Sequence, residues 1–218
     1  CRSSLLISAD GDNETRIRQH TAAVEAASRA GVGFIAYTSV GNAQESKLGL
    51  APVHKATEDA ILAAGIPYSF LRNNWYLENE LSSIQAVQAG APWVTSAGSG
   101  KVGWATRDDY AAAAVAVLTG EGHENSVYEL SGPLLSQEEL AAAVGKVIGK
   151  EVTVQQVDDD TYAEIMKAAG LPDFLLPMLV GIQQGIREHQ LEVSPSDFEK
   201  VIGRPVTPTE EALRQILA

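Results

Sequence analysis

The residues best suited to binding or catalysis lie together in the segment LRNNWYLEN, residues 71–79. It follows a short apolar run and places two amides, an indole and a phenol at consecutive positions: Asn73, Asn74, Trp75 and Tyr76. An amide side chain both donates and accepts hydrogen bonds, and aromatic rings stack against flat ligands. Because exposed loops rarely combine these residue types so closely, we interpret the segment as part of a binding site.

Polar or aromatic residues also follow two earlier apolar runs. The first run leads into Ser8 and Ala9, and the second ends in Tyr37, Thr38 and Ser39. In an open parallel sheet, ligands bind beyond the carboxyl ends of the strands. If the three runs are neighbouring parallel strands, these side chains and the segment at residues 71–79 converge on one cleft.

The elements that would hold this cleft are visible in the first 73 residues. Three short runs, at residues 4–8, 34–39 and 68–73, are apolar on both faces, as buried parallel strands are. Between them lie two segments with apolar residues at helical spacing, one ending at Gly31 and the other, at residues 53–64, ending at Gly65. The β-α-β-α-β order predicts an α/β fold with a parallel sheet covered by helices.

The rest of the chain is richer in helical patterns. Thr106 caps a predicted helix that ends at Gly120, and Ser136 with Glu139 forms a predicted capping box. Further elements are predicted as a helix at residues 77–88 and as strands at residues 92–96, 126–132 and 151–158. We interpret this half as a second, smaller α-rich lobe on the carboxyl edge of the sheet.

Composition restricts the classes of function. The 218 residues carry a formal net charge of −12, which disfavours nucleic acid and anionic membrane surfaces as partners. Cys1 is the one cysteine, so neither an internal disulfide nor a cysteine metal site is expected. The chain has no apolar run of about 18 residues, the length needed to span a membrane. These features predict a cytoplasmic protein without a metal.

Three motifs resemble functional loops in unsuitable contexts. The G-x-G-x-x-A pattern at residues 31–36 follows a helix and opens a strand, the reverse of a dinucleotide loop. AGSGK at residues 97–101 lacks the first glycine and the hydroxyl residue of a nucleotide-triphosphate loop. YTSVG approximates a hydrolase elbow with Ser39 as nucleophile, but Tyr37 occupies the position that requires glycine. The four histidines lie on separate segments without metal-ligand spacing.

Several segments together resemble NmrA-like atypical short-chain dehydrogenases/reductases, in particular the branch of type 2 NAD(P)H:quinone oxidoreductases and triphenylmethane reductases. They are, in order, LLIS, GVGFIAYTSV, HKATEDAILAAGIPYSFLRNNWYLEN, AGSGKVGWATRDDYAAAAVAVLT, GHENSVYELSG and FEKVIGRPVTP. The resemblance covers essentially the whole chain. The residues around 71–79 and the TRDDYAAAA helix are its most specific parts.

The resemblance implies a Rossmann-like doubly wound parallel sheet whose first βα units, with the glycine-rich diphosphate loop, are missing from this sequence. An unpaired sheet edge and exposed apolar surface are then expected. Residues 1–75 would form the cofactor-binding part, with residues 104–132 returning to it. Residues 76–103 and 133–218 would form the substrate lobe.

The resemblance also implies a reaction, in which NADPH or NADH, with NADPH preferred, passes hydride directly to a quinone or dye-like aromatic acceptor without flavin or metal. His54, Asn73 and Tyr76 are the implied catalytic residues. The cofactor would contact His54, Asn73 and the residues on its track, Ser8, Ala9, Tyr37, Thr38 and Ser39. The acceptor would contact Asn74, Trp75 and Tyr76.

The sequence leaves alternatives open. His54 is otherwise a solvent-facing residue at a helix start, Trp75 a packing residue between the lobes, and Arg72 an ion-pair partner rather than a phosphate ligand. The alternative function is a dinucleotide-binding, redox-sensing regulator without turnover, but the proton-competent His54 and Tyr76 favour an enzyme. The protein would be a monomer or a homodimer.

Overall fold

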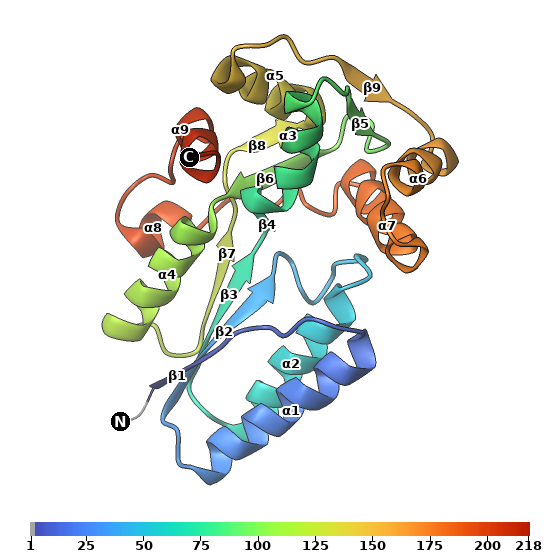
Figure 1. Cartoon of the computed structure of the whole chain (residues 1–218). Helices are drawn as coiled ribbons and strands as arrows, with labels where there is room; N and C mark the ends of the chain where they lie inside the picture. Colours follow the sequence, from blue (N-terminus) through green and yellow to red (C-terminus); the bar gives the residue numbers. More distant parts are fainter. Residues whose placement is uncertain (1–2) are drawn as a thin grey trace.

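The computed structural model describes residues 3–218, so Cys1 lies outside the described residues. Its centre is a parallel sheet in the strand order β1 (Ser3–Leu6), β2 (Phe34–Val40), β3 (Tyr68–Asn73) and β7 (Ser126–Leu130). The three predicted strands are therefore present, with β1 shorter and β2 one residue longer than predicted. β7 is the fourth strand, reached through the second half of the chain (Figure 1).

Helices cover both faces of this sheet. On one face, α1 (Asn13–Arg29) and α2 (Ala51–Ala64) pack against side chains such as Ile35 and Phe70. On the other face, α4 (Arg107–Thr119) and α8 (Phe198–Ile202) pack against Ala36 and Leu71 (Figure 1). Successive strand residues therefore point to opposite, helix-covered faces. This is the predicted α/β arrangement.

The remaining elements form a second part with its own core, beyond the carboxyl ends of the strands (Figure 1). Short strands β4 (Trp75–Tyr76), β6 (Lys101–Ala105) and β8 (Leu134–Ser136) pair in one sheet, and β5 (Trp93–Thr95) pairs with β9 (Val154–Gln156). The helices of this part are α3 (Leu81–Gln88), α5 (Gln137–Ile148), α6 (Asp159–Ala168), α7 (Leu176–Arg187) and α9 (Thr209–Ile216), with 3-10 turns at Leu77–Glu80 and Asp173–Leu175.

Local sequence signals explain several boundaries. The Thr106 side chain accepts a hydrogen bond from the Asp109 amide, and both bonds of the Ser136–Glu139 capping box are present. Both predicted helix starts are thereby confirmed. The helix predicted at residues 77–88 is wrong in its first turn, which is a 3-10 turn before α3. The α2 helix begins two residues earlier than predicted, because Pro52 fits the first turn of a helix.

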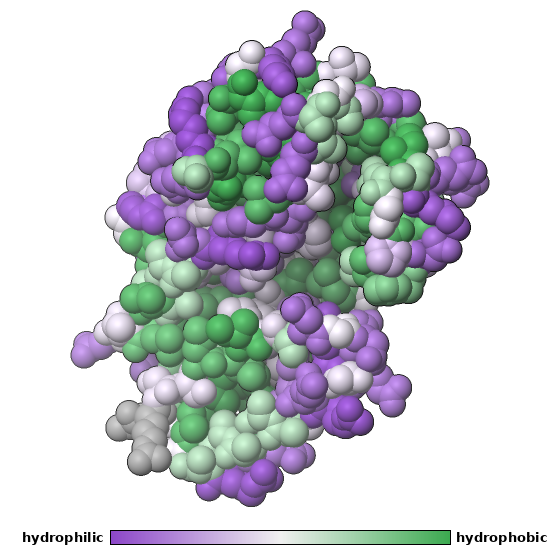
Figure 2. All heavy atoms as spheres, in the orientation of Figure 1, coloured by the Kyte–Doolittle hydropathy of each residue, from purple (hydrophilic) through white to green (hydrophobic). Residues whose placement is uncertain are grey.

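Two features bear on the predicted division of the chain. Within residues 3–218, β1 pairs with one strand only, and the apolar side chains of Leu5 and Ile7 nearby are exposed. Figure 2 shows hydrophobic surface on this side of the sheet. In addition, α8 packs against α4 and β7 on the sheet, whereas the sequence predicts the second lobe for all of residues 133–218. The two-part division otherwise stays a prediction.

Candidate active site

The predicted site residues gather at the carboxyl end of the sheet, where β1, β2 and β3 face the second part of the molecule (Figure 1). Figure 2 shows a recess between the two parts, with hydrophobic atoms in its floor. Most of these residues form three hydrogen-bonded pairs. Ser8 pairs with Thr38, Tyr37 pairs with His54, and Asn73 pairs with Tyr76.

The Tyr37–His54 pair lies between β2 and the first turn of α2. The Tyr37 hydroxyl is 2.9 Å from Nδ1 of His54, and the two side chains are 0% and 7% exposed. Burial raises the pKa of Tyr37 to about 12. Burial also lowers the pKa of His54 to about 3, and the positive charge of Arg16 adds to this effect. His54 is therefore a neutral imidazole at ordinary pH, and its side chain is largely buried.

A second buried histidine holds the turn after β1. The Ala9 amide donates to Nε2 of His20 at 2.9 Å, and Nδ1 of His20 lies 2.9 Å from the Thr57 hydroxyl. Since a backbone N–H can only donate, the proton of neutral His20 is on Nδ1. The Ser8 amide donates to the Thr38 hydroxyl at 2.9 Å. The side chains of Thr38 and His20 therefore hold the backbone at Ser8 and Ala9 in place at the predicted cofactor edge.

The Asn73–Tyr76 pair lies at the end of β3. Nδ2 of Asn73 donates to the Tyr76 hydroxyl at 3.1 Å, while Oδ1 of Asn73 is buried and accepts no hydrogen bond within residues 3–218. Asn73 is only 6% exposed. Tyr110 and Arg107 hold the Tyr76 ring, with Tyr110 edge-on at 5.1 Å and the Arg107 guanidinium 5.5 Å from the ring centre. A buried acceptor without a donor is costly, and it suits a ligand that carries an N–H group.

Asn74 and Trp75 have packing contacts. Nδ2 of Asn74 donates to the Ser131 hydroxyl and the Leu191 carbonyl, and the residue is 2% exposed. The Trp75 indole is half-buried against the core of the second part, and β4 pairs it with Trp104. The packing alternative for Trp75 is therefore present in the structure. Contact of Asn74 or Trp75 with an acceptor stays a prediction.

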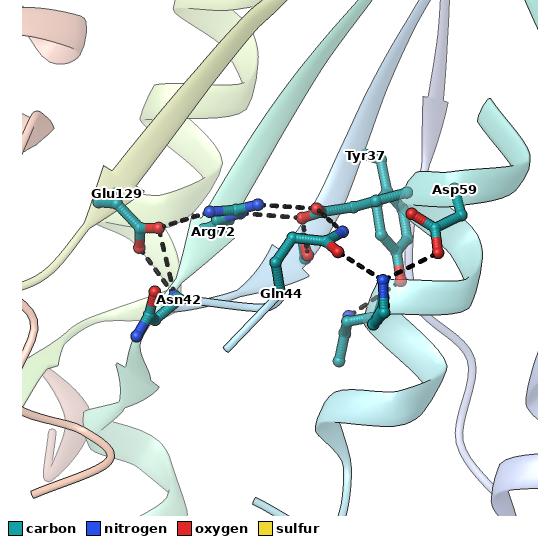
Figure 3. A network of polar contacts seen from close by, with 10 residues as sticks. Tyr37, Asn42, Gln44, Asp59, Arg72 and Glu129 are labelled. Carbon is teal, nitrogen blue, oxygen red and sulfur yellow. Dashed lines mark hydrogen bonds and ion pairs between the residues drawn. The ribbon is translucent and has the colours of Figure 1, made fainter. Parts of the chain in front are cut away.

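An ion-pair network crosses the sheet beside this site (Figure 3). The Arg72 guanidinium binds Glu58 of α2 at 2.8 Å and Glu129 of β7 at 2.9 Å, so its ion-pair role is confirmed. Both carboxylates raise the pKa of Arg72. Glu58 also accepts hydrogen bonds from Ser39 at 2.7 Å and from Gln44 at 2.9 Å.

Ser39 is consequently unsuited to nucleophilic catalysis. Its hydroxyl proton is donated to Glu58, the side chain is buried, and within the described part of the chain no histidine is hydrogen-bonded to it. This agrees with the sequence argument that YTSVG is not a hydrolase elbow. Contact of Ser39 with a cofactor stays a prediction. Because the Ser39 hydroxyl is bound to Glu58, such a contact would involve the backbone of Ser39.

Comparison with known proteins identifies the family. The profile of the NmrA-like family matches residues 2–209. This chain belongs to the NmrA-like family. It is 40% identical over 213 residues to Quinone oxidoreductase 2 of Escherichia coli (strain K12), covering 97% of this chain and 74% of that protein. It is 28% identical over 192 residues to an NAD(P)H azoreductase of Xenophilus azovorans, covering 87% of this chain and 67% of that protein.

Solved structures of NmrA-like relatives agree with the fold. The E. coli NADPH-dependent quinone oxidoreductase complexed with NADPH superimposes with a TM-score of 0.93 at 40% identity, covering 100% of this chain and 77% of that one. The Citrobacter sp. triphenylmethane reductase complexed with NADP(H) gives a TM-score of 0.91 at 38% identity, covering 99% and 76%. This NmrA-like chain therefore has the Rossmann-like α/β fold of NAD(P)-binding oxidoreductases.

The residues present fit the nicotinamide end of such a cofactor. Oδ1 of Asn73 needs an N–H donor, which a carboxamide carries, and Tyr76 next to it has a hydroxyl and an aromatic face. Within residues 3–218, no group of three or more histidine, cysteine, aspartate or glutamate side chains could hold a metal ion. No helix in the same range is long and apolar enough to cross a membrane.

The structure places the predicted site residues on opposite faces of the sheet. Tyr37 and Ser39 point to the α1 and α2 face of the sheet, whereas Leu71 marks the α4 face, to which Asn73 also belongs by alternation. The sequence analysis missed three residues that surround the site: Arg16, His20 and Thr57. The available signal was the spacing of His54, Thr57 and Glu58, which places three polar residues on one helix face toward the sheet.

Proposed function

We propose that the protein is an NAD(P)H-dependent reductase that transfers hydride directly to a quinone or quinone-like aromatic acceptor without flavin. The buried Asn73–Tyr76 pair with its unpartnered Oδ1 supports this proposal most directly. The 40% identity to Quinone oxidoreductase 2 supports the acceptor class. NADPH is the proposed cofactor, because the E. coli relative is described as NADPH-dependent.

The chain's own residues would bind and orient the cofactor and the acceptor. Asn73 would accept a hydrogen bond from the carboxamide and keep the ring in one orientation, which removes part of the entropic barrier. Tyr76 would form one wall of the acceptor slot, with Trp75 and Asn74 at its second-lobe side. The turn at Ser8 and Ala9, together with Thr38, would lie along the cofactor track. When bound, the reduced nicotinamide supplies the hydride.

His54 would act on the acceptor oxygen, where negative charge develops as the quinone becomes a hydroquinone anion. A neutral imidazole N–H can stabilise that charge as a fixed hydrogen-bond donor. Burial makes this interaction stronger than it would be in water. The proton that completes the hydroquinone would come from water.

The test is oxidation of NADPH by the purified protein with a benzoquinone, followed by the absorbance of the reduced cofactor. The variant Asn73→Ala should lower kcat/KM at least several-fold, while Asn79→Ala, an exposed amide in the same segment, should match the wild type. Equal kinetics for wild type and Asn73→Ala would refute the role of Asn73. Tight NADPH binding without turnover of any quinone would refute the reductase and favour the redox-sensing regulator.

A further inference from the structure

The phenol of Tyr37 has no role in the proposed reaction, yet it contacts the one imidazole that does. We infer that Tyr37 is a positioning residue that donates its hydroxyl proton to Nδ1 of His54 and thereby holds His54 as the Nε2–H tautomer. This inference rests on the proposed function for its catalytic meaning, but the tautomer itself is a property of the protein alone.

The surrounding hydrogen bonds support this direction. The Ala9 amide fixes the proton of His20 on Nδ1, and His20 therefore donates to the Thr57 hydroxyl. Thr57 in turn donates to the Val53 carbonyl at 2.7 Å. The Thr57 proton is thus unavailable to Tyr37. Within residues 3–218, the fully buried Tyr37 hydroxyl makes one hydrogen bond, at 2.9 Å to Nδ1 of His54, so its own proton has a partner when it is donated to that nitrogen.

The second ring nitrogen of His54 is left for a ligand. Within residues 3–218, Nε2 of His54 makes no hydrogen bond, and this atom is not fully buried. It therefore retains access to solvent in a side chain that is otherwise enclosed. With Tyr37 on Nδ1, this accessible nitrogen carries a proton and offers a donor.

Tyr37 positions His54 but does not relay protons through it. If His54 gave its Nε2 proton to an acceptor oxygen, Nδ1 would have to take the phenol proton, and a buried tyrosinate would remain. Burial resists that charge, as the raised pKa of Tyr37 reflects. No bond to hydrogen is therefore broken in either side chain. His54 stabilises the developing oxyanion as a donor, and water supplies the proton.

The tautomers can be read by long-range ¹H–¹⁵N NMR spectra of histidine-labelled protein without cofactor. We expect His54 as the Nε2–H form and His20 as the Nδ1–H form, so the two buried rings serve as opposite references in one spectrum. His54→Gln and His20→Gln assign the signals. A wild-type spectrum with His54 protonated on Nδ1 would overturn the inference.

The variant Tyr37→Phe removes only the hydroxyl and should shift the His54 signals toward a tautomer mixture, leaving His20 unchanged. The matched control is Tyr68→Phe on the neighbouring strand, whose ring stacks on Phe70 at 4.3 Å and whose hydroxyl makes no hydrogen bond within residues 3–218. Unchanged His54 signals in Tyr37→Phe would equally overturn the inference.

Kinetics separate this inference from the proposed function. If the protein reduces quinones, Tyr37→Phe should lower kcat about several-fold, in proportion to the loss of the Nε2–H tautomer and less than the roughly 10²–10³-fold for removal of a whole oxyanion donor, with little change in NADPH binding. If the protein reduces no quinone, the NMR result still decides the tautomer. A correct tautomer with unaltered kcat in Tyr37→Phe would refute the positioning role alone.

Discussion

Acidification should destabilise the protein through its buried histidines before the carboxylates titrate. The pKa of His54 is about 3 in the folded chain, against an ordinary value of 6.5. Between these two values, the unfolded chain binds a proton that the folded chain excludes. The free energy of unfolding must therefore rise with pH across this window and fall as the pH decreases.

The size of the effect follows from the shift. Lowering the pH from about 7 to about 5 should cost about 2 kcal/mol through His54 alone, because each pH unit below the unfolded pKa contributes about 1.4 kcal/mol. The pKa of His20 is lowered as well, by its burial and by Arg16, so its contribution has the same sign. Carboxylates with lowered pKa values, such as Asp159, lose their stabilising effect at lower pH still.

The assay is urea unfolding followed by circular dichroism at several pH values in this window. In His54→Gln, the pH dependence of the unfolding free energy should be smaller by about 2 kcal/mol over the window, whatever its absolute stability. Lys55→Gln, an exposed position beside it on α2, should keep the wild-type dependence. If wild type and His54→Gln show the same dependence, His54 is not a buried neutral imidazole and the reasoning fails.

Two further predictions concern the polar contacts that join the elements. Arg72→Met should lower the unfolding free energy by about 3–5 kcal/mol, because it leaves two carboxylates without their cation. Lys55→Met removes an exposed ion pair with Asp59 and should cost less than about 1 kcal/mol. Similar losses for both variants in urea unfolding would contradict the importance of the Arg72 network. Asp109→Ala should accelerate amide hydrogen exchange at Thr207, whose N–H donates to the buried Asp109 carboxylate at 2.9 Å. Unchanged exchange there would show that other contacts hold the C-terminal segment.

Much of the fold was predictable because it depends on local signals. Apolar runs of strand length separated by helical patterns require a helix-covered parallel sheet, and β1, β2 and β3 appear at the predicted places. The caps at Thr106 and Ser136 depend only on neighbouring residues. The fourth strand was recognisable as a strand, but its place beside β3 depends on contacts between residues far apart in sequence, such as Leu71 with Tyr128.

The site was predictable as a location but not as a set of pairs. The sequence indicates that Tyr37, Thr38 and Ser39 belong to a strand at the cleft, yet it does not say which face of the sheet each residue meets. That choice requires knowing which helix covers which face, and both faces here are buried. A buried parallel strand lacks the alternation of polar and apolar residues that would reveal its orientation.

The segment at residues 71–79 illustrates why adjacency in sequence misleads at a strand end. Arg72 points to the α2 face and binds two carboxylates, Asn73 binds Tyr76, and Asn74 binds Ser131. Three consecutive polar residues thus serve three different environments, because the strand alternates and then leaves the sheet for β4. Within residues 3–218, Asn73 and Asn74 are both buried and each has an unpartnered Oδ1, but it is the amide of Asn73 that binds the Tyr76 hydroxyl. Its neighbours fix the direction in which the chain leaves the sheet, and that direction places Tyr76 against Asn73.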